Sequence, residues 1–185
     1  MNDLIYIHGL GSNQNSRKFL LMKEKFQALF NCKCIEWDLL TDIDLLIKKL
    51  YIKYKDHDNL VIVGDSTGGN FAYQLRELMK LTDVKTKLIL LNPLLDFNSR
   101  IASFPFPREI EKYLQVINFV NCCFLLQSTN DEIIDHAKIK TGNRVVQIKI
   151  DDTHRIINFD KYLDDLKNYI EAEGNFLYFP TNTMK

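Results

Sequence analysis

The strongest chemical signal in the sequence is Gly64-Asp65-Ser66-Thr67-Gly68-Gly69, which lies between a short apolar run and an amphipathic segment. A strand can turn abruptly into a helix only where small residues leave room, and Gly64 and Gly68 supply that room. Ser66 then stands at the apex of a strained turn with its hydroxyl exposed, and the new helix points its N-terminus at that hydroxyl. This arrangement predicts that Ser66 is a nucleophile for acyl transfer.

Chain length and sequence exclude two rival interpretations of this tract. Chymotrypsin-like proteases carry a similar Gly-Asp-Ser-Gly-Gly, but they are all-β proteins in which the histidine and the aspartate precede the serine. Only 65 residues precede Ser66, which is too few for that architecture. A phosphate-binding loop would need Gly-Lys followed by Ser or Thr, and no such sequence follows here.

A serine nucleophile needs a base, and His154 is the best placed of the four histidines. It follows the last apolar strand by four residues, so it is expected at the sheet edge where the carboxyl ends of parallel strands share a cleft. His57 lies in a charged loop and is expected in solvent, and His136 is expected on a short helix. His8 ends the first strand and is expected to fix the following loop by hydrogen bonds.

The acid that orients this base should come from a third loop at the same edge. Asp131 stands a few residues after the fifth strand, on a turn from which a carboxylate reaches a neighbouring imidazole. Asp135, one helical turn further on, is the alternative, and it would otherwise cap or solvate its helix. The chain order Ser66, Asp131, His154 is that of α/β-hydrolases.

An acyl-transfer site also needs two backbone N–H groups that bind the oxyanion. One is expected from Thr67, the residue after the nucleophile. The other is expected from Leu10, because the glycines of His8-Gly9-Leu10-Gly11 let the backbone approach the serine closely.

Short apolar runs and amphipathic segments alternate along the chain, which is typical of an α/β fold. Six runs are continuous rather than alternating, as strands covered on both faces should be; they span 4–7, 32–37, 60–63, 87–91, 122–127 and 145–150. Apolar stripes of helical period predict helices at 19–30, 43–54, 71–78 and 159–170. The sequence therefore predicts an α/β-hydrolase fold of about six mainly parallel strands with helices on both faces and a minimal lid.

Composition excludes several classes of partner. The 24 basic and 24 acidic residues give a net charge of 24 − 24 = 0, without the basic excess of nucleic-acid binders. No apolar run approaches the ~20 residues of a membrane span, and the N-terminus lacks a signal peptide, so a cytoplasmic protein is expected. The four cysteines are Cys32, Cys34, Cys122 and Cys123. They do not have the spacing of a zinc site, so no metal is expected. No cofactor is expected either.

One domain is expected over residues 1–174, followed by a tail over 175–185. Residues 96–119 interrupt the strand–helix alternation with an apolar segment broken by Pro105 and Pro107, and a helix is expected over 107–117. Two interpretations stay open for this segment: a small lid over the cleft, or an ordinary crossover with packing aromatics. The oligomeric state is left open.

Together these motifs resemble those of the small YqiA-like esterases, a family of α/β-hydrolases. The matching pieces cover most of the chain in the family's order: Tyr6-Ile7-His8-Gly9, Gly64-Asp65-Ser66-Thr67-Gly68-Gly69, Asn92-Pro93, Asp131-Glu132-Ile133-Ile134-Asp135, His154 and Phe159-Asp160-Lys161-Tyr162. The resemblance implies a compact sheet without the usual preceding hairpin, and hydrolysis of acyl esters or thioesters by Ser66, Asp131 and His154. The chain departs from the family at Asp151-Asp152-Thr153, where glycines often precede the histidine, and a carboxylate here could compete for the imidazole.

These features predict a serine hydrolase that cleaves small-molecule esters or thioesters with short or medium acyl chains. Leu94, Leu95 and Phe97 follow the fourth strand and are expected to line the cleft, although the same residues would serve equally as core. Two alternatives stay open: an acyltransferase that uses the same serine, and a non-hydrolytic ligand-binding or interaction protein on this fold. An intact set of serine, aspartate and histidine argues against the second.

Overall fold

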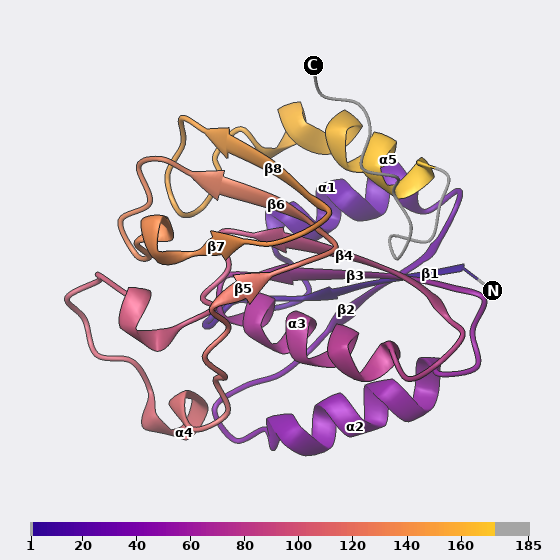
Figure 1. The fold of residues 1–185 in the computed structure, drawn as a ribbon, viewed down its shortest axis with the longest axis horizontal. Coiled ribbons are helices and arrows are strands. Elements are labelled where there is room, and N and C mark those ends of the chain that lie inside the picture. The colour runs from indigo at the N-terminus through magenta and orange to yellow at the C-terminus, as the bar shows by residue number, and fades with distance from the viewer. Residues whose placement is uncertain (1, 173–185) are drawn as a thin grey trace.

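The computed structural model describes residues 2–172 of the chain. Its centre is a sheet of six parallel strands in the order β2-β1-β3-β4-β6-β8 (Figure 1). These strands are β1 (Asn2–Ile7), β2 (Asn31–Ile35), β3 (Asn59–Asp65), β4 (Lys85–Leu91), β6 (Cys123–Ser128) and β8 (Val145–Ile150). Each apolar run selected in the sequence overlaps one of these strands, although the run 32–37 extends two residues beyond the end of β2. The predicted α/β class is confirmed.

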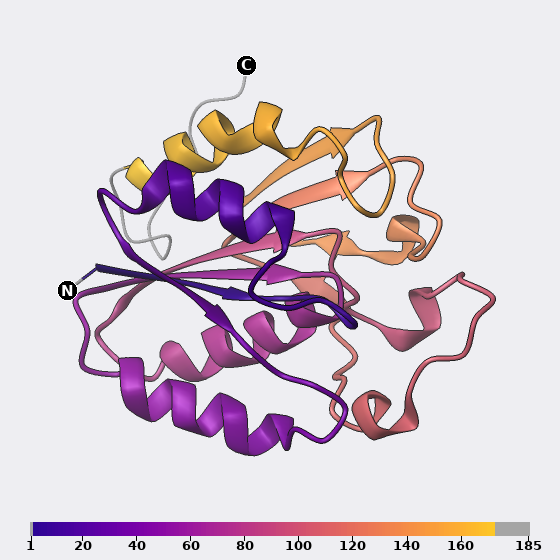
Figure 2. The same cartoon turned by 180° about the vertical axis from the view of Figure 1, so that it is seen from behind.

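Helices cover both faces of the sheet (Figures 1 and 2). On one face lie α1 (Arg17–Phe26) and α5 (Leu163–Glu171), and on the other lie α2 (Ile43–Tyr54) and α3 (Thr67–Met79). Successive residues of a strand point to opposite faces, so Leu4 and Tyr6 join the core under α1 and α5, while Ile5 and Ile7 join the core under α2 and α3. Because both cores are apolar, the strands appear in the sequence as continuous apolar runs.

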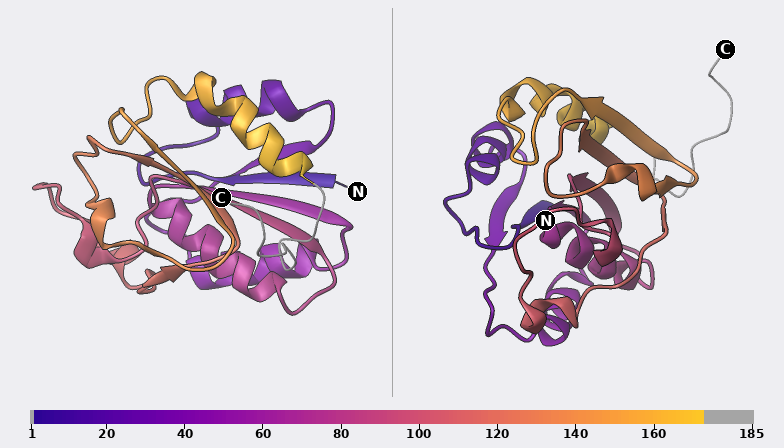
Figure 3. Two further views of the ribbon diagram at one scale, coloured as in Figure 1. Left: turned by 45° about the horizontal axis from the view of Figure 1, so that its top comes forward. Right: turned by 90° about the vertical axis from the view of Figure 1, so that its left-hand side faces the viewer.

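The carboxyl ends of the parallel strands meet at one edge of the sheet, which faces the viewer in the right-hand view of Figure 3. Ser128 pairs with Ile150, so β6 and β8 end level and their following loops begin side by side. The turns after β1, β3, β6 and β8 carry the four positions selected from the sequence, namely Leu10, Ser66, Asp131 and His154.

The segment 96–119 packs against the loop that bears Asp131. Arg100 forms an antiparallel bridge with Ile134, and the N–H of Ile101 donates to the carbonyl of Ile133 at 2.8 Å. These backbone contacts hold segment 96–119 beside the loop that follows β6.

The helix expected over 107–117 is wrong in length. The segment contains the 3-10 turn η1 (Phe97–Ser99) and a helix, α4, of only four residues (Arg108–Glu111). The chain then leaves the helical path, because the N–H of Ile117 donates to the carbonyl of Leu95 at 2.8 Å. The remaining short elements are β5 (Phe119–Val120), β7 (Lys140–Thr141), η2 (His136–Lys138) and η3 (Phe159–Tyr162).

No helix within residues 2–172 is both long enough and apolar enough to cross a membrane. The tail expected over 175–185 lies outside the described residues, and the domain boundary at residue 174 stays a prediction.

Candidate active site

Ser66 occupies the sharp connection between β3 and α3. Its backbone has φ 52° and ψ −120°, a conformation that a residue with a side chain adopts only under strain. The turn also leaves no room for larger neighbours, because a Cβ on Gly68 would overlap the carbonyl oxygens of Ile7 and His8. The serine therefore sits on the crowded strand-to-helix turn that the sequence predicts.

A buried ionic cluster ties this turn to α1. Asp65 accepts hydrogen bonds from the hydroxyl of Tyr6 at 2.8 Å and from the ammonium of Lys18 at 2.6 Å. Burial, and then the charge of Asp65, raise the pKa of Tyr6 well above its usual value, so the phenol keeps the proton that it donates. Asp65 has no role in the site predicted from the sequence, where its place directly before Ser66 is the available signal.

His154 bridges the serine and the aspartate. Its Nε2 lies 2.9 Å from Oγ of Ser66, and its Nδ1 lies 3.0 and 2.8 Å from the two carboxylate oxygens of Asp131. A carboxylate can only accept, so Nδ1 carries the proton and Nε2 is free to accept the proton of the hydroxyl. The structure brings together the three side chains selected from the sequence; their catalytic role stays a prediction.

Asp131 is held by several donors besides His154. Its Oδ1 accepts from the N–H groups of Ile133 and Ile134 at 2.8 and 2.9 Å, and its Oδ2 lies 2.7 Å from Nε2 of His136. Burial alone would raise the pKa of this carboxyl, but the hydrogen bonds from the two histidines outweigh burial and hold the pKa well below its usual range. Asp131 is therefore an anion at neutral pH. The sequence predicts His136 on a short helix and does not predict this contact.

The two alternative carboxylates have partners of their own. Asp135 accepts from the N–H of Ala137 at 3.0 Å and caps η2. This capping is the structural role that the sequence offers for Asp135 if it is not the acid of the site. Asp152 closes its own loop by accepting from three N–H groups at 2.7, 2.9 and 3.0 Å, those of Thr153, Ile157 and Asn158. Asp152 thus shapes the loop of His154 and does not compete for its imidazole.

Asn92, which has no role in the site predicted from the sequence, joins the ends of three strands. Its buried Nδ2 donates to the carbonyl of His154 at 3.0 Å and to Oγ of Ser128 at 2.8 Å, and its Oδ1 accepts from the N–H of Ser128 at 2.7 Å. Ser128 in turn donates to the carbonyl of Thr153 at 2.7 Å. This network fixes the backbone that carries the imidazole, and Asn92-Pro93 was its signal in the sequence.

Two backbone N–H groups near the serine donate to no backbone carbonyl within residues 2–172. Thr67 is the first residue of α3, so its N–H has no acceptor in the helix. Leu10 lines the same cleft as Ser66, and its N–H donates to no backbone carbonyl within residues 2–172. Gly9 brings the Leu10 loop against the serine, because a Cβ on Gly9 would lie 3.1 Å from Cβ of Ser66. These are the two donors expected for an oxyanion.

His8 holds that loop in place. Its Nδ1 lies 2.8 Å from the carbonyl oxygen of Gly9, its Nε2 accepts from the N–H of Trp37 at 3.3 Å, and its ring stacks on the indole at 5.2 Å between centroids. Both ring nitrogens are occupied, so His8 fixes the loop by hydrogen bonds as expected.

The cleft at Ser66 has a volume of about 500 Å³ and a basic wall. Three basic side chains line it, those of Arg17, Lys18 and Arg155. The carboxylate among the lining residues is that of Asp65, and it is already paired with Lys18. The cleft is therefore positively charged although the chain as a whole is neutral.

The apolar residues expected in the cleft lie elsewhere. Leu94 and Leu95 are 2% and 0% exposed and belong to the core. Phe97 packs against Phe106, with ring centroids 5.5 Å apart. Neither these residues nor any other of segment 96–119 is among the described residues that line the cleft. The structure favours the core alternative for the two leucines; a substrate contact of Phe97 and a lid over 96–119 stay predictions.

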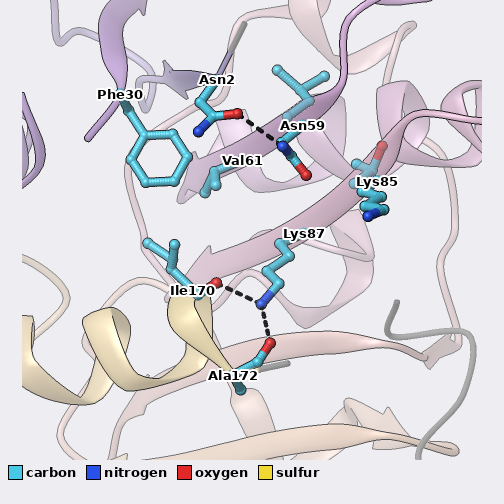
Figure 4. A pocket seen from close by; sticks show the side chains of 10 residues that line it. Asn2, Phe30, Asn59, Val61, Lys85, Lys87, Ile170 and Ala172 are labelled. Atoms are coloured by element: carbon cyan, nitrogen blue, oxygen red, sulfur yellow. Dashed lines mark hydrogen bonds between the residues drawn. The ribbon is translucent and has the colours of Figure 1, made fainter. Parts of the chain in front are cut away.

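A second hollow, drawn in Figure 4, lies at the opposite edge of the sheet, near the amino ends of β1, β3 and β4. There the ammonium of Lys87 donates to the carbonyl oxygens of Ile170 and Ala172 at 2.5 and 2.8 Å and so caps the end of α5. None of the described residues that line this hollow is a histidine, a cysteine or a carboxylate. Across residues 2–172, no three such side chains gather in a way that could hold a metal ion.

Comparison with known proteins assigns the fold. A model of the family described as "Uncharacterised protein family (UPF0227)" matches residues 3–115. No curated protein matches the sequence.

Solved structures similar to the chain include a presumed hydrolase from Agrobacterium vitis S4, at 15% identity and a TM-score of 0.69 over 92% of this chain and 88% of that one. Alpha/beta hydrolase domain-containing protein 10 from mouse has 13% identity and a TM-score of 0.64, with 91% and 89% covered. Est1E from Butyrivibrio proteoclasticus has 16% identity and a TM-score of 0.59, with 91% and 85% covered. At these identities the likeness establishes the α/β-hydrolase fold, which confirms the predicted fold class.

Proposed function

The chain belongs to the uncharacterised protein family UPF0227, the YqiA-like family, and we propose that it is a serine hydrolase that cleaves carboxylic esters or thioesters. One observation carries the proposal. A hydrogen-bonded chain runs from Ser66 through His154 to Asp131, with contacts of 2.9 and 2.8 Å, and starts on a strained strand-to-helix turn. The likeness of the fold to solved hydrolases supports the same conclusion.

In the first half-reaction, Oγ of Ser66 attacks the acyl carbonyl while Nε2 of His154 takes the hydroxyl proton. Asp131 stabilises the resulting imidazolium and keeps its own charge. The bond to the leaving oxygen or sulfur then breaks, and His154 gives its proton to the departing alcohol or thiol. The acyl group is left as an ester on Ser66.

In the second half-reaction, a water molecule gives a proton to His154 and attacks the acyl-enzyme. The carboxylic acid leaves, and Ser66 regains its proton from the imidazolium. In both halves the carbonyl oxygen becomes an anion, which the N–H groups of Thr67 and Leu10 and the N-terminus of α3 stabilise.

The charge of the cleft favours substrates with an anionic group near the scissile carbonyl. Arg17 donates to the carbonyl oxygens of Ile156 and Ile157, which holds its guanidinium at the cleft wall. Neither Arg17 nor Arg155 forms an ion pair within residues 2–172, and Arg155 is exposed. Guanidinium groups bind carboxylate and phosphate in a bidentate manner. The whole cleft has a volume of about 500 Å³. The anionic group of the substrate fills part of it, and the rest has room for an acyl chain of short or medium length.

A series of p-nitrophenyl esters and acyl thioesters of increasing chain length tests this proposal. The wild type and the control variant Ser103→Ala, at an exposed serine of segment 96–119, are expected to hydrolyse the preferred member equally. Ser66→Ala is expected to lower kcat by on the order of 10⁴ to 10⁶. Equal rates in Ser66→Ala and wild type would contradict the proposal. Product that appears only after an alcohol, amine or thiol acceptor is added would identify an acyltransferase, and binding of an ester without turnover would identify a binding protein.

A further inference from the structure

A second imidazole contacts the carboxylate of Asp131. Nε2 of His136 lies 2.7 Å from Oδ2, the same oxygen that lies 2.8 Å from Nδ1 of His154. The side chain of His136 is only 10% exposed. The acyl-transfer steps use neither of its ring nitrogens, so this buried histidine has no part in moving the proton of Ser66.

The surroundings determine which nitrogen of His136 carries a proton. Asp131 only accepts, so Nε2 of His136 must be the donor in this contact. Nδ1 is buried and has no hydrogen-bond partner within residues 2–172. A proton on Nδ1 would have no acceptor there, so the neutral ring with its single proton on Nε2 fits this position. His136 is therefore a neutral donor to the carboxylate.

We propose that His136 is a positioning residue that acts on His154 through Asp131, an inference that rests on the proposed function. It has two effects. His136 occupies Oδ2 while backbone N–H groups occupy Oδ1, which leaves the carboxylate a single orientation toward the base. A further donor also spreads the charge of the carboxylate and weakens its attraction for the protonated imidazole of His154.

Charged groups other than Asp131 lie near His136 and His154, and within residues 2–172 none of them forms a hydrogen bond with the ring of His136. A hollow of about 500 Å³ behind Asp131 is lined by Asp135, which caps η2, and by Lys149, which is exposed on β8. On the other side, the carboxylate of Glu132 accepts the backbone N–H of His154 at 3.0 Å. A substitution of the second histidine leaves all of these charges in place. The difference between variant and wild type therefore reports on the donor to Oδ2.

The test compares two substitutions at one position. His136→Leu removes the donor, whereas His136→Gln keeps an amide N–H at similar reach. His57→Gln is the matched control, because it removes a histidine–carboxylate contact at the far edge of the sheet. Two readouts are followed against pH: the imidazole ¹⁵N and ¹H resonances of the substrate-free protein, and kcat/KM for the best ester of the chain-length series.

In His136→Leu the titration midpoint of His154 is expected to move upward by about half a pH unit, the equivalent of one net hydrogen bond. The acid limb of kcat/KM should move by the same amount. His136→Gln should stay near the wild type, and His57→Gln should move neither readout. A folded His136→Leu with an unchanged midpoint overturns the proposal, even where its thermal stability falls, because that result makes the contact purely structural.

Two results keep this test separate from that of the proposed function. The resonances are measured without substrate, so a wild type that hydrolyses no ester removes the proposed function and leaves the midpoint comparison intact. Where His136→Leu fails to fold, the wild-type spectrum decides. A proton on Nε2 of His136 supports the proposal, and a ring protonated on Nδ1 alone overturns it.

Discussion

Within residues 2–172, two aspartates contact histidine rings, Asp131 and Asp3, and they lie at opposite edges of one sheet. At the carboxyl ends of the strands, Nδ1 of His154 lies 2.8 Å from Asp131, and Nε2 lies 2.9 Å from the hydroxyl of Ser66. At the amino ends, Nδ1 of His57 lies 2.7 Å from Asp3, whose side chain is fully buried. Nε2 of His57 has no hydrogen-bond partner in the described part of the chain, and its ring packs in a T-shaped arrangement with that of Tyr54, with centroids 5.1 Å apart.

The two pairs are almost identical in distance, so a short imidazole–carboxylate contact does not by itself make a site. Asp3 also accepts from the side chain of Asn31 at 2.9 Å and lies 3.8 Å from the ammonium of Lys33, and it thereby anchors the start of β1. The pair at the other edge differs because a strained turn delivers a hydroxyl to it and a basic cleft opens beside it. We therefore propose that the first edge carries the chemistry and that the second stabilises the fold.

The largest expected difference between the edges is in activity. Ser66→Ala and His154→Gln should each lower kcat by on the order of 10⁴ to 10⁶, as removal of a triad member does elsewhere. His57→Gln should stay within about twofold of the wild type because no reacting group lies near it. Steady-state ester hydrolysis measures all three. A comparable loss of kcat in His57→Gln would contradict the proposal that only the pair beside Ser66 is catalytic.

The aspartates should separate activity from stability. Asp131→Asn presents an amide where a carboxylate must orient the imidazole, so kcat should fall by roughly 10³ to 10⁴. Asp3→Asn should leave kcat unchanged and lower the free energy of unfolding by about 1–3 kcal/mol, because a buried acceptor of several donors is altered. Urea unfolding followed by circular dichroism, run beside the kinetics, checks both. An Asp3→Asn variant of full stability would refute the anchoring role.

A smaller effect should appear in substrate preference at the edge with the serine. Arg155→Gln removes from the cleft wall a guanidinium that forms no ion pair within residues 2–172. This change should raise KM about tenfold for an ester with a terminal carboxylate. Mono-p-nitrophenyl adipate and the neutral p-nitrophenyl hexanoate have acyl chains of equal length and make a matched pair of substrates. A KM that rises equally for both esters would mean that Arg155 does not recognise charge.

The smallest effect concerns acid stability. The pKa of Asp131 is lower in the folded protein than the roughly 3.9 of an unfolded aspartate. Its charge therefore stabilises the fold at neutral pH, and this contribution disappears as the pH falls below about 4. The unfolding free energy of the wild type should thus drop more steeply below pH 4 than that of Asp131→Asn, by on the order of 1 kcal/mol. Parallel curves for the two proteins would show that Asp131 is not stabilised as an anion.

The sequence was sufficient to select Ser66, Asp131 and His154, because parallel strands bring the residues after their carboxyl ends to one edge. The contact of His136 with Asp131 depends on the conformation of the irregular turn between these two residues. A hydrophobic period in the sequence does not predict that conformation. The contact of His57 with Asp3 joins residues 54 positions apart, and its charged flanks suggested solvent.

The walls of the cleft were the least predictable part. An apolar residue after a strand looks the same in the sequence whether it faces a core or a cleft. The sequence therefore allows both positions for Leu94 and Leu95. Their burial places them in the core. The basic wall comes from Arg17 at the start of α1 and from Arg155 in the loop after β8, two positions that only the tertiary fold brings together.

The most direct test of the central claim, that His154 activates Ser66, is covalent labelling by a fluorophosphonate mapped by mass spectrometry. The wild type should form one adduct, on Ser66, and His154→Gln should label far more slowly while His57→Gln labels like the wild type. Failure of the folded wild type to label, or labelling at another serine, would contradict the account.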